Sequence, residues 1–65
     1  MIGKQGRVTG RVAAGLVGEV MIQVRGGAEA FHAYAAIPGE EIPKGAVVVV
    51  VEYHAPRTVY VEQIL

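Results

Sequence analysis

The chain has 65 residues, 52% of them hydrophobic, and its six basic side chains balance six acidic ones. A chain this short buries only about 60% of the surface that it exposes when unfolded. It contains no cysteine, which excludes disulfides and thiolate metal sites as supplements to the core. No stretch approaches the roughly 20 apolar residues of a transmembrane helix, and the first residues lack the apolar core of a signal peptide. We therefore predict a single soluble domain over residues 1–65 that folds by apolar packing alone.

The first strand is predicted over residues 6–13. Val8 and Val12 lie on one face of this segment, and Arg7 and Arg11 lie on the other. Such period-2 alternation is typical of a strand with one buried face and one solvated face. The twelve valines of the chain fit this interpretation, because β-branched side chains pack well on a pleated sheet.

A β-hairpin is predicted next, around Gly26 and Gly27. The segment 20–25 alternates apolar and polar residues, and the segment 29–35 does so with Phe31 on its apolar face. Two glycines between alternating segments indicate a tight primed turn, since primed turns need positive φ.

Two further strands follow a connector over residues 37–45, where two prolines exclude a regular helix. The fourth strand spans residues 47–54, the fifth spans residues 58–64, and residues 55–57 form the turn between them. Tyr60 is expected on the outer face of the last strand. Five strands with short connections and no helix predict an all-β fold, a small five-stranded OB-like barrel rather than a sandwich.

The run of five valines at residues 47–51 departs from this alternation. One interpretation is a strand that a neighbouring loop or the chain termini cover on both sides. The other is an exposed apolar strip containing Val48 and Val50, reinforced by Met21 and Tyr60, that docks a partner.

No catalytic or metal-binding constellation is recognisable. His54 shares a strand face with Glu52, and His32 is the other histidine, but a metal site needs three or four convergent ligands. The chain has no Cys or Ser nucleophile, and Glu40 and Glu41 are neighbours on a Pro/Gly loop, where their side chains diverge. We expect no enzyme activity, no cofactor and no metal.

Binding of single-stranded nucleic acid is the alternative that an OB-like barrel raises. It needs a basic groove with aromatic platforms on which bases stack. Arg7, Arg11 and Arg25 could share one face, but the chain has only four aromatic residues and no net positive charge. We interpret these arginines as a solubilising face, which argues against nucleic acid as a partner.

Several short motifs resemble one known family. Residues 2–6, Ile-Gly-Lys-Gln-Gly, are similar to the I-G-K-x-G that opens the soluble C-terminal domain of NfeD-like membrane proteins. Residues 39–52 resemble the family's G-x-x-I-x-x-G-x-x-V-x-V-V pattern, and Phe31 begins an aromatic-x-Ala motif. The likeness covers nearly the whole chain. The chain departs from the pattern in the segment 12–18, which lacks a Pro-x-Gly element, and in the turn 54–57, which lacks the usual glycine.

The resemblance implies an OB-like barrel tethered to a membrane by helices outside this chain, with the soluble domain on the cytoplasmic side. Members of the family are associated with stomatin- and flotillin-like (SPFH) proteins in membrane protein quality control or membrane organisation. Some longer forms carry a separate serine protease domain, which has no counterpart in this sequence. The implied role is a docking module rather than a catalyst.

We therefore predict a protein-interaction module with Met21, Val48, Val50 and Tyr60 as its candidate partner-binding residues. A few large apolar or aromatic anchors would carry most of the binding energy. Two alternatives stay open beside it. One is the single-strand nucleic-acid binder, and the other is a structural role in which the valine strip joins identical copies into a homo-oligomer.

Overall fold

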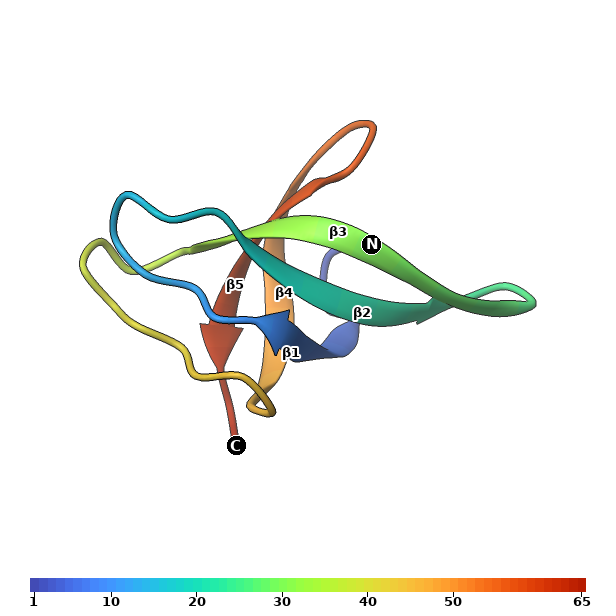
Figure 1. The fold of residues 1–65 in the computed structure, drawn as a ribbon. Helices are drawn as coiled ribbons and strands as arrows, with labels where there is room; N and C mark the ends of the chain where they lie inside the picture. The colour runs from blue at the N-terminus through green and yellow to red at the C-terminus, as the bar shows by residue number, and fades with distance from the viewer.

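The computed structural model describes residues 1–65, which form five β-strands and no helix. The strands are β1 (Gln5–Gly10), β2 (Gly18–Val24), β3 (Gly27–Ala35), β4 (Val47–His54) and β5 (Thr58–Gln63). They close into a barrel in the order β1–β2–β3–β5–β4, with β4 paired to β1 (Figure 1). All pairs are antiparallel except β3 with β5, which is parallel. The predicted all-β, five-stranded OB-like barrel is confirmed, and no helix that could span a membrane is present.

The core fills the inside of this barrel. The buried residues of β2, of β5 and of the first half of β4 alternate with less buried ones, as the period of two requires. Twelve apolar side chains make one buried cluster, and Met1, Val24 and Ala35 pack against it. The cluster consists of Val8, Val12, Val20, Ile22, Phe31, Ala33, Ile42, Ala46, Val48, Val50, Val59 and Val61.

In the valine run of β4, the side chains that face the core are those that we predicted to be exposed. Val48 and Val50 are 0% and 1% exposed, so the expectation that they form a surface strip is wrong. Val48 pairs with Gly6 of β1, and this register turns its side chain inward. The outward members are Val47 and Val49, which are half-buried. The apolar strip on the outside of β4 is therefore offset by one residue from the predicted one.

A β-bulge at Val51 reverses the faces in the second half of β4. The pairing of β4 with β5 shifts register between Val50 and Glu52, so Val51 is an extra residue in the ladder. Under strict alternation Glu52 would follow Val50 into the core. Because of the bulge, Glu52 is instead exposed and lies opposite Tyr60 of β5.

The β2–β3 hairpin turns one residue earlier than predicted. Val24 pairs with Gly27, so the two turn residues are Arg25 and Gly26. Gly26 has a φ of 84°, and no residue other than glycine has a positive φ. A primed turn needs positive φ at the first turn residue, whereas a type II turn needs it only at the second. The turn therefore has the sign pattern of type II, and the predicted primed turn is wrong.

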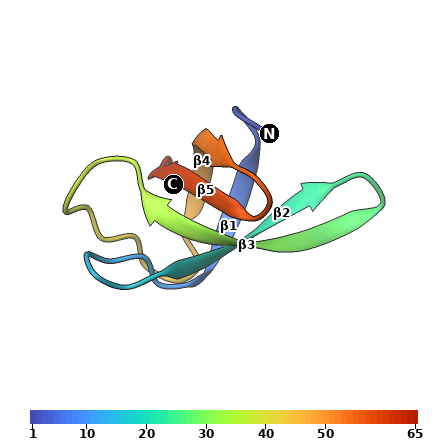
Figure 2. The ribbon, with the colours of Figure 1, turned by 90° about the horizontal axis from the view of Figure 1, so that it is seen from above.

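One end of the barrel is closed by a contact between two loops. β1 ends at Gly10 rather than at residue 13, and Val12 forms an isolated bridge with Ile42 of the connector. Both side chains are buried, and their backbones exchange hydrogen bonds of 3.0 and 2.8 Å. Gly18 lies directly against this contact, since a Cβ on it would approach Val12 Cγ2 to 2.5 Å. Figures 1 and 2 show the two loops together at one end and the β2–β3 hairpin projecting at the other.

Candidate interaction surface

The four predicted partner-binding residues lie in three different places. Val48 and Val50 are in the core and cannot contact a partner of the folded domain. Met21 and Tyr60 are half-buried and point outward, but from β2 and β5, which β3 separates. Each of these two residues lines its own surface depression, and the two depressions have no lining residue in common.

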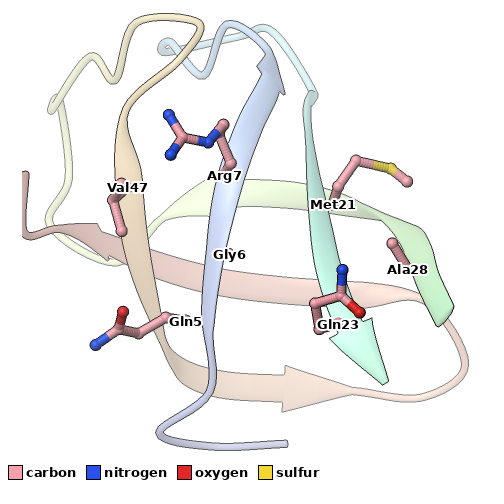
Figure 3. A pocket seen from close by; sticks show the side chains of 7 residues that line it. All are labelled: Gln5, Gly6, Arg7, Met21, Gln23, Ala28 and Val47. Atoms are coloured by element: carbon pink, nitrogen blue, oxygen red, sulfur yellow. The ribbon is translucent and has the colours of Figure 1, made fainter. Parts of the chain in front are cut away.

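The first depression has a volume of about 340 Å³ and is lined by residues of β1, β2, β3 and β4 (Figure 3). Met21 sits at one side of it, opposite Arg7, its register partner on β1. Arg7 is the only ionic residue in the lining, and its Nη1 donates a hydrogen bond to the Gly45 carbonyl at 3.0 Å. The lining residues are Gln5, Gly6, Arg7, Met21, Gln23, Ala28 and Val47.

The second depression has a volume of about 390 Å³ and lies beside β3 and β5, against the two loops that close the barrel end. Small residues make up most of its lining, and the exceptions are two tyrosines, a proline and two glutamates. Alanines and glycines leave the faces of the larger side chains open. The lining residues are Ala13, Ala14, Gly15, Tyr34, Ala35, Ala36, Pro38, Gly39, Glu40, Glu52 and Tyr60.

Three of these side chains form a row across neighbouring strands. Tyr34 of β3 pairs with Tyr60 of β5, and Tyr60 pairs with Glu52 of β4. The tyrosine rings are stacked, with centroids 5.4 Å apart and planes inclined by 26°. The His54 ring packs edge-on against Tyr60 at 5.4 Å, and its Nε2 lies 2.7 Å from Glu52 Oε2. The row Tyr34–Tyr60–Glu52 is therefore braced on the side that faces His54.

Of the two carboxylates at this depression, Glu52 contacts His54, whereas Glu40 has no basic residue beside it in the lining. Glu40 and Glu52 are the only ionic lining residues of the depression, and no Lys or Arg contributes to it. Glu40 Oε1 is covered and accepts no hydrogen bond. The neighbouring Glu41 instead pairs with Arg11 at 3.7 Å, so the two adjacent glutamates diverge as predicted.

The other predicted polar groups make local contacts. Glu52 and His54 share a strand face, as predicted, and the structure shows that they touch, but no group of three or more His, Cys, Asp and Glu side chains forms around them. Arg11 pairs with Glu41, and Arg25 sits in the hairpin turn. The arginine that sequence reasoning overlooked is Arg57, which pairs with Glu29 at 2.9 Å and lies over the Phe31 ring.

The closed strand order and the parallel β3–β5 pair place the chain in the class of OB-like barrels with no helical insertions. The chain belongs to the NfeD C-terminal domain family, whose model matches residues 5–62. It is similar to the solution structure of the soluble domain of the NfeD protein YuaF from Bacillus subtilis. That comparison gives 28% sequence identity and a TM-score of 0.78, and it covers 94% of this chain and 70% of the other. Among curated proteins, none matches this chain. The family resemblance noted in the sequence is confirmed.

Proposed function

We propose that this domain is a non-catalytic protein-interaction module of a membrane-anchored NfeD-like protein. Its partner is a stomatin- or flotillin-like (SPFH) protein, and the pair acts in membrane protein quality control or membrane organisation. Membership of the NfeD C-terminal domain family supports this proposal. The helices that attach the protein to the membrane lie outside this chain, and the barrel extends from the cytoplasmic side.

One observation carries the docking role, namely the row Tyr34–Tyr60–Glu52. Aromatic side chains are the most frequent anchors of protein interfaces, and they work best when they are already fixed in the free protein. The two rings hold each other by stacking, and Tyr34 keeps 38% of its surface exposed. The row therefore offers a rigid aromatic surface at an open depression.

The single-strand binder receives less support from the same surface. Bases would stack on Tyr34 and Tyr60, but the two carboxylates that line the same depression, Glu40 and Glu52, repel phosphates. The basic side chain that lines the other depression, Arg7, has no aromatic residue beside it in that lining. Aromatic platform and positive charge are thus on separate surfaces.

Affinity isolation of the intact protein from detergent-solubilised membranes of its own cells tests the proposal. The expected result is enrichment of an SPFH protein, identified by mass spectrometry, over a control in which an unrelated membrane protein carries the same tag. The reading frame that contains this chain should also encode apolar segments of about 20 residues. A protein that fractionates with the cytosol and enriches no SPFH protein would contradict the proposal.

A further inference from the structure

The second depression combines two aromatic faces with two carboxylates. Tyr34 and Tyr60 supply the faces, and Glu40 and Glu52 supply the negative charge. The π-face of a tyrosine attracts a cation, and a carboxylate within reach adds a charge-assisted hydrogen bond. Each feature alone is common on protein surfaces, but together they match one class of ligand group.

The domain itself offers a basic partner to only one carboxylate of this depression, Glu52, whose Oε2 lies 2.7 Å from His54 Nε2. No Lys or Arg lines the depression. The cations nearest in sequence to its loops are engaged elsewhere or point to solvent: Arg11 pairs with Glu41, and Lys44 is exposed and makes no hydrogen bond. Glu40 is partly buried, and its covered Oε1 accepts no hydrogen bond from any protein donor. A carboxylate in this situation gains from a cation that arrives with a ligand.

The shape of the depression favours a long side chain. Its remaining lining is alanine, glycine and proline, so nothing large stands between the tyrosine rings and the loop that carries Glu40. A flat guanidinium can stack on an aromatic ring while it donates hydrogen bonds in its own plane, which a compact ammonium cannot do. Arginine therefore fits this surface better than lysine.

We infer that the depression around Tyr34, Tyr60, Glu40 and Glu52 binds an arginine side chain presented by a partner polypeptide. The inference rests on the proposed function and specifies the chemistry of the docked surface. The bulge at Val51 contributes to this site, because it places Glu52 on the outside of β4 beside Tyr60. Charge complementarity selects the occupant: an acidic segment or a nucleic acid would meet two carboxylates there.

An NMR titration of the domain with N-acetyl-arginine-N-methylamide at low salt tests this inference. The expected result is saturable shifts confined to amides of the lining, such as those of Ala14, Gly15, Tyr34 and Gly39. The citrulline analogue, which keeps the shape and lacks the charge, should bind about tenfold more weakly. Added salt should weaken binding of the arginine probe but not of the citrulline probe. Equal binding of both probes, or shifts spread over the surface, would overturn the inference.

Two isosteric variants test which glutamate contributes the charge that binds the arginine probe. Glu40→Gln should weaken binding of the arginine probe several-fold. Glu41, the adjacent residue, pairs with Arg11, so Glu41→Gln should leave the affinity for the probe unchanged. Both substitutions keep the side-chain size, so both domains should retain the spectrum of the folded barrel. Identical affinities of the two variants would overturn the assignment of Glu40.

Two further results separate this inference from the proposed function. If the arginine probe fails while Tyr34→Ala still abolishes association with the SPFH protein, the docking role stands and the arginine chemistry is wrong. If the domain self-associates with rising concentration and Arg25→Ala abolishes that association, the depression holds the hairpin arginine of a second copy. That outcome would overturn the assignment to a different polypeptide.

Discussion

The rings of Tyr34 and Tyr60 stack across the parallel β3–β5 pair, with their centroids 5.4 Å apart and their planes inclined by 26°. The two residues are direct register partners, so the backbone itself brings the rings together. A pair of this kind contributes about 0.5–1.5 kcal/mol beyond the area that it buries. The contact therefore serves both the stability of the barrel and the rigidity of its exposed aromatic surface.

A double-mutant cycle measures this contact. We expect Tyr34→Ala and Tyr60→Ala each to lower the free energy of unfolding, and the double variant to lose about 0.5–1.5 kcal/mol less than the sum of the two losses. Urea denaturation followed by circular dichroism gives the change in the free energy of unfolding for the two single variants and the double variant. Strictly additive losses would show that the rings do not interact in solution.

The two faces of the valine run should respond very differently to a charge. Val48→Glu places a carboxylate in the core, and we expect this variant not to fold, since a domain of this size has only a few kcal/mol of stability. Val49→Glu places the same group on the half-buried outer face and should keep the fold. One-dimensional NMR of both variants distinguishes them. A folded Val48→Glu domain would mean that the register of β4 is wrong.

A pair of glycines tests the packing at the closed barrel end. A methyl group at Gly18 would lie 2.5 Å from Val12 Cγ2 and 2.7 Å from the Gly10 carbonyl oxygen. Gly18→Ala should therefore lower the free energy of unfolding by about 1–3 kcal/mol. Gly27→Ala meets no atom within 4 Å and no positive φ, so it should be neutral or stabilising by up to about 1 kcal/mol. Thermal unfolding of both variants gives the comparison, and equal transition temperatures would contradict it.

Two isoleucines of the connector should differ in the same way. Ile42 is 0% exposed and bridges Val12, whereas Ile37 is 50% exposed. Ile42→Ala should lower the free energy of unfolding by about 2–5 kcal/mol, because it removes buried methyl groups and leaves a cavity. Ile37→Ala should change it by less than about 0.5 kcal/mol. If chemical denaturation showed similar losses for both, the connector would not close the core.

The inward residues of most strands could be predicted from alternation alone. Val20, Ile22, Val59 and Val61 all face the core, and each has a polar residue on at least one side, which indicates the phase of the strand. A run of five valines has no such phase. Only the pairing of Val48 with its neighbour on β1 decides which members are buried, and pairing is not visible in the sequence of one strand.

The candidate site depended even more on long-range geometry. Glu52 reaches the outer face through a bulge, which arises from the register between β4 and β5 rather than from a local motif. Tyr34 joins Tyr60 through the pairing of β3 with β5, and Glu40 joins them because the connector lies beside the loop at residues 13–15. The sequence indicated that Tyr60 points outward, and the structure adds the partners that make it part of a surface.

The most direct test of the docking surface compares two tyrosine variants of the intact membrane protein. Tyr34 and Tyr53 are 38% and 37% exposed, but only Tyr34 lines the depression with Tyr60. We expect Tyr34→Ala to lose most of the SPFH protein that is isolated with the wild type, and Tyr53→Ala to retain it. Both isolated domains should first be shown to fold. Equal retention by the two variants, or equal loss, would contradict docking through the Tyr34–Tyr60–Glu52 row.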